Sequence, residues 1–145
     1  MPIGDKMKDL QFVKEKLVEY FKNEPAVNSV YIFGSFSSGR QTPISDLDIA
    51  VLYNENIPLI EELRHTAEVS SLLKMERIDL INLNKAPIHL QHEIVSTGVK
   101  IFDRIPQLTQ DFIENMLGIY HDYQGILTKY RQDLREGLME EYLND

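Results

Sequence analysis

The sequence predicts a single α/β (α+β) domain, with a small mixed β-sheet of three to five strands flanked by helices and followed by a long C-terminal helical segment. Three observations predict this fold. The chain has 145 residues, the length of one domain with a real core. Short β-branched and aromatic runs alternate with amphipathic segments. The last part of the chain repeats apolar residues at spacings of three and four. We therefore expect one domain over 1–145, with a core over about 5–103 and a helical extension over about 106–143.

The N-terminal half is expected to form a helix, two strands around a loop, and a second helix. Leu10, Val13 and Leu17 recur at spacings of three and four, and Pro25 ends that helix because the residue before a proline avoids the helical region. Pro58 is favoured at the start of the second helix. The expected ranges are 5–23, 29–33, 46–53 and 58–74, and the expected apolar side of the second helix consists of Ile60, Leu63, Ala67, Val69 or Ser70, and Leu73.

The C-terminal half is expected to continue with a strand, a short helix, a small strand and a long helix, over 77–83, 87–96, 99–102 and 106–142. Gly98 is expected to cap the short helix. Gly118, Gly125 and Gly137 each cost the long helix about 1 kcal/mol relative to alanine, so we expect bends or a break there. Unbroken, this helix would reach about 55 Å. Part of its apolar face is expected to meet another chain.

The composition excludes several classes of function. A net charge of -8 and a pI near 5.0 argue against binding of extended nucleic acid, which needs Lys and Arg to replace phosphate counterions. A nucleotide stays compatible if metal ions supply the positive charge. The absence of cysteine excludes disulfides and thiolate metal sites and suits the cytoplasm, where we expect the protein. No run approaches the roughly 18 apolar residues of a membrane span. The histidines, His65 among them, are expected to be surface polar residues without a metal role.

The segment from Val30 to Tyr53 carries the candidate chemistry. An apolar strand ends at Gly34-Ser35, and ten residues later Asp46 and Asp48 open a second strand. Because side chains alternate across a strand, both aspartates point to one face, about 6.6 Å apart along the chain.

A third carboxylate is expected beside these two. Asp79 interrupts the apolar alternation of the third strand, where an isolated aspartate is out of place. If that strand pairs with the second in register, Asp79 projects beside Asp46 and Asp48. Carboxylates this close either take up protons or bind cations, and oxygen ligands favour Mg²⁺ or Mn²⁺. Taken alone, an Asp-X-Asp sequence is more often a helix cap or a turn, and the whole pattern favours the functional interpretation.

Gly34, Ser35, Asp46 and Asp48 match the signature of Gly-Ser, ten residues and Asp-X-Asp. In this segment the chain resembles the nucleotidyltransferase superfamily of DNA polymerase beta type. The short chain is similar to the minimal nucleotidyltransferases, many of which are antitoxins encoded beside a HEPN-domain ribonuclease toxin. The resemblance implies a polymerase beta-like fold.

The resemblance also implies a role for each site residue. Gly34 and Ser35 would hold the phosphates of ATP, with a following helix N-terminus. Asp46 and Asp48 would bind two Mg²⁺ ions, with Mn²⁺ as an alternative. Asp79 would complete the metal shell near the attacking hydroxyl.

The loop departs from the family in one respect. Arginines often follow Gly-Ser in these proteins, and Phe36 and Ser38 stand in those places here. Arg40 is the only arginine of the loop and is the candidate phosphate contact.

The favoured function is therefore transfer of AMP from ATP to a hydroxyl of a partner protein. By resemblance the partner is a HEPN toxin, which this antitoxin would adenylylate, with a tyrosine as the acceptor. Two alternatives stay open. One is transfer to a small molecule such as an aminoglycoside, although only about 40 residues follow Phe102, too few for the usual acceptor domain. The other is an antitoxin that acts by binding alone.

Overall fold

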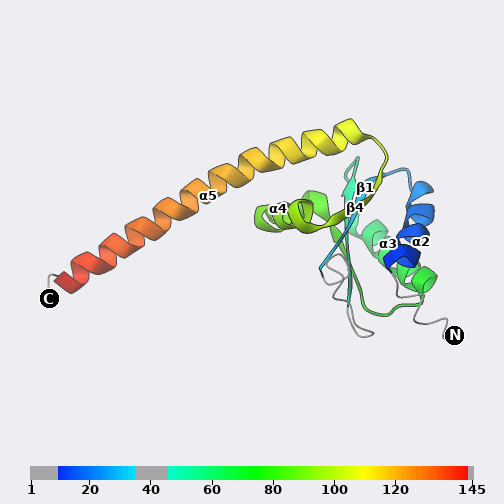
Figure 1. Ribbon diagram of the computed structural model, residues 1–145, viewed down its shortest axis with the longest axis horizontal. Helices are drawn as coiled ribbons and strands as arrows, with labels where there is room; N and C mark the ends of the chain where they lie inside the picture. Colours follow the sequence, from blue (N-terminus) through cyan, green and yellow to red (C-terminus); the bar gives the residue numbers. More distant parts are fainter. Residues whose placement is uncertain (1–9, 35–45, 144–145) are drawn as a thin grey trace.

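The computed structural model describes residues 10–34 and 46–143, and within them it contains a four-stranded mixed sheet (Figure 1). The strand order is β3-β2-β1-β4. β1 is antiparallel to both β2 and β4, and β2 is parallel to β3. The strands are β1 (Val27–Phe33), β2 (Leu47–Tyr53), β3 (Ile78–Asn82) and β4 (Val99–Asp103). The predicted α/β class with a small mixed sheet is confirmed.

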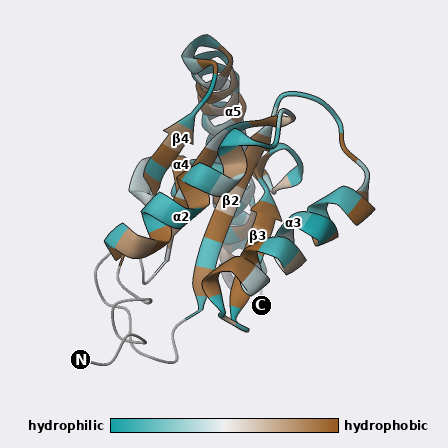
Figure 2. Ribbon diagram, turned by 90° about the vertical axis from the view of Figure 1, so that its right-hand side faces the viewer, coloured by the Kyte–Doolittle hydropathy of each residue, from teal (hydrophilic) through white to brown (hydrophobic). Residues whose placement is uncertain are grey.

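Helices cover both faces of this sheet, so that the molecule has three layers (Figures 1 and 2). Helices α2 (Leu10–Lys22) and α3 (Leu59–Leu73) cover one face, which we name the closed face. Helix α4 (Ile88–Thr97) and the first turns of α5 (Pro106–Leu143) cover the other, which we name the open face. A short 3-10 helix, η1 (Leu83–Lys85), joins β3 to α4.

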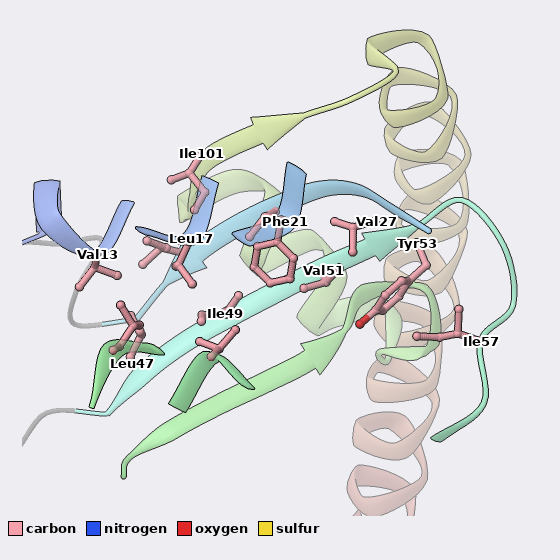
Figure 3. Close-up of a cluster of buried hydrophobic side chains, with 14 residues drawn as sticks. Val13, Leu17, Phe21, Val27, Leu47, Ile49, Val51, Tyr53, Ile57 and Ile101 are labelled. Atoms are coloured by element: carbon pink, nitrogen blue, oxygen red, sulfur yellow. The ribbon is translucent and has the colours of Figure 1, made fainter. Parts of the chain in front are cut away.

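Alternation along β2 assigns its side chains to the two faces. Leu47, Ile49 and Val51 are fully buried on the closed face, as predicted, against Leu17 and Phe21 of α2 (Figure 3). The residues between them point to the open face, where Ala50 and Leu52 are buried with Ile94 of α4. The parity of the strand therefore places Asp48 on the open face.

A bulge in β1 provides an asparagine whose hydrogen bonds hold the start of α5 against the sheet. Val27 pairs with Tyr53 and Ser29 with Leu52, which leaves Asn28 as an extra residue. The Asn28 Nδ2 donates to the Thr109 Oγ1 at 2.8 Å and to the Ile105 carbonyl at 3.2 Å. Its Oδ1 accepts from the Ile105 N–H at 3.2 Å. These bonds satisfy a buried amide and fix where α5 begins.

The break that was expected in the long C-terminal helix, α5, is absent. This helix is one continuous α-helix of 38 residues, through Gly118, Gly125 and Gly137. A Cβ added at any of these glycines would have nothing within 4 Å, so no neighbouring element requires a glycine at these positions. Three separate costs of about 1 kcal/mol are small beside a complete ladder of backbone hydrogen bonds. Beyond Tyr120 every described side chain is exposed except that of Leu127, which is partly covered.

Helix α3 buries only part of the side that was predicted. Val69 and Leu73 are buried, as expected. Ile60 and Leu63 are instead 69% and 54% exposed, and His65 is buried in their place. The prediction that His65 is a surface residue is therefore wrong. The His65 Nδ1 lies 2.8 Å from the Tyr53 hydroxyl, and the two rings stack with centroids 5.7 Å apart. A histidine with this partner is satisfied in the core, which a count of apolar spacings does not detect.

Charged residues join α3 to the turn that follows α2. The Arg64 guanidinium forms two hydrogen bonds of 3.0 Å to the Glu24 carboxylate. The Glu24 Oε2 also lies 3.4 Å from the His65 Nε2. The hydrogen bonds from Arg64 lower the pKa of Glu24 below its ordinary value.

Gly98 ends α4 as predicted, but for a different reason. Its φ is -77°, so it does not occupy the left-handed region. A Cβ there would overlap the Ile94 carbonyl and lie 3.2 Å from the Ile32 carbonyl. The glycine therefore allows the C-terminus of α4 to approach the end of β1 closely. Among the described helices, none is long and apolar enough to cross a membrane.

Candidate active site

The candidate catalytic residues lie at one end of the sheet, where the termini of three neighbouring strands meet. Gly34 follows β1, whose last residue, Phe33, pairs with Asp48 near the start of β2. Asp48 in turn pairs with Asp79 near the start of β3. Because β1 runs antiparallel to β2 and β2 runs parallel to β3, the end of the first strand meets the beginnings of the other two. The in-register pairing predicted for the second and third strands is confirmed.

The three aspartates lie on one side of the sheet at this end. Asp48 and Asp79 are direct neighbours across parallel strands, so both side chains point to the open face. Asp46 precedes Asp48 by two residues. Asp48 is half-buried, whereas Asp46 and Asp79 are exposed. The exposed pair flanks a carboxylate that is partly withdrawn from water.

The protonation of Asp48 reflects these surroundings. Burial raises the pKa of the Asp48 carboxyl above its ordinary value, and the negative charges of Asp79 and Asp46 raise it further. Asp48 therefore has neighbours of like charge at the position where the sequence predicted mutual repulsion. A bound cation would relieve that repulsion.

Gly34 is required by the position of Asp48. The φ of Gly34 is 75°, in the left-handed region that favours glycine. A Cβ at this position would overlap the Asp48 Oδ2 and lie 3.3 Å from its Cγ. The backbone of the turn and the half-buried carboxylate are thus in direct contact, and any side chain at position 34 would push Asp48 away.

Arg77 is a neighbour of the site that the sequence interpretation missed. Its Nη1 lies 3.7 Å from the Asp46 Oδ1. Its position two residues before Asp79 was the available signal, because that spacing keeps both side chains on one side of the strand. The pair is exposed, and such ion pairs contribute little to stability. Its effect is to give Asp46 a cationic neighbour.

The donor set fits a hard divalent ion. Three carboxylates supply only oxygen ligands, which Mg²⁺ and Mn²⁺ prefer. Within residues 10–34 and 46–143, no group of three His, Asp or Glu side chains already converges on a metal position. Asp46 lies beside Arg77, so an ion bound by all three carboxylates would compete with this ion pair. Ser35 and Arg40, the other predicted site residues, lie outside the described part of the chain.

The sequence matches a known family over most of this fold. The profile described as Polymerase beta, Nucleotidyltransferase matches residues 15–107. The chain is 30% identical over 93 residues to the protein adenylyltransferase MntA of Shewanella oneidensis, which covers 63% of this chain and 66% of that protein. The match thus spans slightly under two thirds of that relative. A protein of Methanocaldococcus jannaschii with a provisional protein adenylyltransferase name is 37% identical over 81 residues, or 54% of this chain and 82% of that one.

Solved structures share the three-layer fold. A chain in a crystal structure of a toxin-antitoxin with AMP-PNP superposes with a TM-score of 0.71 at 26% identity, over 87% of this chain and 98% of that one. A chain in the tri-AMPylated Shewanella oneidensis HEPN toxin in complex with MNT antitoxin gives a TM-score of 0.67, over 90% and 98% of the two chains. The second likeness, at 24% identity, shows the fold alone.

Proposed function

Because this chain belongs to the Polymerase beta, Nucleotidyltransferase family, we propose that it transfers AMP from ATP to a hydroxyl group of a partner protein. The partner we propose is a HEPN toxin, which the chain would neutralise as an antitoxin. The observation that carries this proposal is the pairing of Asp48 with Asp79 beside Gly34, inside the matched range 15–107. The protein adenylyltransferase name of the MntA relative and the toxin-antitoxin with AMP-PNP support the choice of substrate and partner.

In the proposed reaction, the acceptor oxygen, which we propose to be that of a tyrosine, attacks the α-phosphorus of ATP. A new phosphorus–oxygen bond forms, the bond to the β-phosphate bridging oxygen breaks, and pyrophosphate leaves with that oxygen. The acceptor hydroxyl loses its proton to water. Asp79 is exposed beside the half-buried Asp48, which suits a carboxylate close to an incoming hydroxyl.

The residues of the chain would mainly position and neutralise. Gly34 lets the backbone approach the phosphates, since it carries no side chain and adopts a left-handed φ of 75°. Ser35 and Arg40 are proposed as further phosphate contacts. Asp46, Asp48 and Asp79 would hold Mg²⁺. Bound there, the metal would stabilise the charge on the attacking and leaving oxygens.

Incubation of the chain with Mg²⁺, labelled ATP and the purified product of the adjacent gene tests this proposal. Mass spectrometry should show an AMP adduct on that protein. Asn at both Asp46 and Asp48 should abolish the adduct and weaken metal-dependent ATP binding. A matched control is Glu55→Gln, an exposed carboxylate at the opposite end of β2, which should leave transfer unchanged.

Three results would contradict the proposal. Full transfer by the double Asn variant would remove these carboxylates from the chemistry. Tight binding of the partner without any adduct would identify an antitoxin that acts by binding alone. An adduct on an added aminoglycoside, with none on the protein, would select the small-molecule alternative.

A further inference from the structure

The distal half of α5 presents an apolar stripe that no described element of this chain covers. We name as the distal stripe the exposed residues Tyr123, Ile126, Tyr130, Leu134 and Leu138. Tyr130 and Leu134 are 62% and 52% exposed. Figure 1 shows that this part of the helix extends well away from the sheet. At the rise of an α-helix, the residues of α5 after Tyr120 span about 34 Å.

The stripe occupies one side of the helix. Its members recur at spacings of three and four, the pattern of a buried helix face. Thr128, Gln132 and Glu136 lie on the other side and are polar and exposed. Met139 is also exposed and lies on this other side. Five apolar residues in line over the distal half indicate an interaction surface, because singly scattered apolar residues would not line up.

The direction of the distal stripe relative to the sheet is set where α5 packs against α4, just before the stripe begins. The rings of His92 in α4 and Tyr120 in α5 stack with centroids 3.7 Å apart and planes 3° apart. Both helices belong to the open face, the face to which Asp48 and Asp79 point. A protein bound along the stripe therefore lies on the same side of the sheet as the carboxylates.

The comparison with the toxin-antitoxin structure links α5 to a partner. That match covers 87% of this chain and must include part of α5, because only 105 residues precede the helix. The matched chain, 98% covered, comes from a complex of a toxin and an antitoxin. Part of α5 thus belongs to the fold shared with a chain from a toxin-antitoxin structure.

We propose that the distal stripe docks an amphipathic helix of the protein acceptor. A helix is the occupant that fits, because side chains spaced by three and four along α5 leave holes that a second helix fills at the same spacing. The stripe sets the affinity for the acceptor and takes no part in the chemistry. This inference rests on the proposed function for the identity of the acceptor, the HEPN-type protein.

The test compares two double variants of the full chain. One replaces Tyr130 and Leu134 with Glu, in the stripe. The control replaces Thr128 and Gln132 with Glu, which adds the same charge at the same spacing on the polar side. For each, we measure the affinity for the purified product of the adjacent gene without ATP, the KM for that protein in AMP transfer, and the affinity for Mg²⁺-ATP.

The stripe variant should weaken binding of the partner and raise its KM by about ten-fold or more, as loss of central interface residues does. Its affinity for Mg²⁺-ATP and its helical circular dichroism should match the wild type, and the control should stay within about two-fold.

Partner affinity and KM unchanged in the stripe variant would overturn the inference while leaving the proposed function intact. A wild-type dimer that becomes a monomer in the stripe variant, with partner affinity unchanged, would also overturn it, since a second copy would then cover the stripe. Failure of the wild type to transfer AMP would overturn the proposed function, and the affinity measured without ATP would still decide the docking site.

Discussion

The closed and open faces of the sheet are built from alternate residues of the same strands, and they are covered very differently. The closed face holds a cluster of fourteen buried residues beneath α2 and α3. The open face holds a cluster of five beneath α4 and the base of α5. The larger cluster means that most of the apolar stabilisation comes from the closed face. The open face carries the aspartates and the start of α5, whose distal half extends away from the sheet.

Charge separates the faces in the same way. On the closed face, the Arg64 guanidinium lowers the pKa of Glu24, so this carboxylate is stabilised in its ionised form. On the open face, burial and two like charges raise the pKa of Asp48. One face satisfies its charges within the chain. The other keeps like charges beside a half-buried carboxylate, which a bound cation would relieve, and such an arrangement is typical of a functional site.

The largest effect is expected on the closed face. Phe21→Ala removes a fully buried ring from the main cluster and should lower the free energy of unfolding by about 3–5 kcal/mol. Urea denaturation followed by circular dichroism measures it. Leu63→Ala, on the exposed side of α3, is the control and should change stability by less than about 0.5 kcal/mol. Equal effects for the two variants would refute the contrast between buried and exposed positions.

On the open face, a substitution should lower the rate of AMP transfer rather than the stability. Asp79→Asn should lower AMP transfer by about 100-fold or more, as loss of one charge-stabilising group does at other active sites. ATP affinity should change less. The free energy of unfolding should stay the same or rise, because one like charge beside Asp48 is gone. Turnover like that of Glu55→Gln would remove Asp79 from the site.

A smaller effect is expected for the hydrogen bond between Tyr53 and His65. Tyr53→Phe keeps the ring stack and removes the hydroxyl that lies 2.8 Å from the His65 Nδ1. A buried nitrogen left without its partner should cost about 1–2 kcal/mol of unfolding free energy. Tyr123→Phe, at an exposed site on α5, is the matched control. A stability loss no larger than that of the control would show that the hydroxyl contributes nothing.

The smallest effects are opposite slopes of stability with pH, measured without divalent ions. The folded-state pKa of Glu24 lies below its ordinary value of 4.5, so its stabilisation is present above that value and is lost as the pH falls through the folded pKa. The folded-state pKa of Asp48 lies above its ordinary value of 3.8, so stability is lost as the pH rises through the folded pKa.

Two single variants separate these contributions. Glu24→Gln should weaken the loss of stability on acidification, and Asp48→Asn should steepen it, because the gain from protonating Asp48 disappears. Urea denaturation at several values between about pH 3 and 6 gives the slopes. A change of the slope in the same direction in both variants, relative to the wild type, would contradict the contrast between the faces.

Much of the fold and of the candidate site followed from local patterns. The strand periodicity located β2 and β3, and the lone aspartate in the third strand predicted the pairing of Asp79 with Asp48. The site roles of Ser35 and Arg40 stay predictions, as do the metal roles of the aspartates. The buried side of α3 was predicted correctly at Val69 and Leu73 and wrongly at its start. The spacing of Ile60 and Leu63 gives no information about Tyr53 on β2, the hydrogen-bond partner that His65 meets in the core.

The sequence by itself determined the elements whose cause is local. Alternation set which side of each strand the aspartates occupy, and the glycine turn after β1 set where the site begins. The tertiary structure alone decided which partners those elements meet. It buried His65 in the core and brought Arg77 beside Asp46. It also allowed α5 to continue through three glycines as one helix whose distal half is exposed. The reason is physical: alternation and turn chemistry act between neighbours in the chain, whereas burial and ion pairing act between residues that only folding brings together.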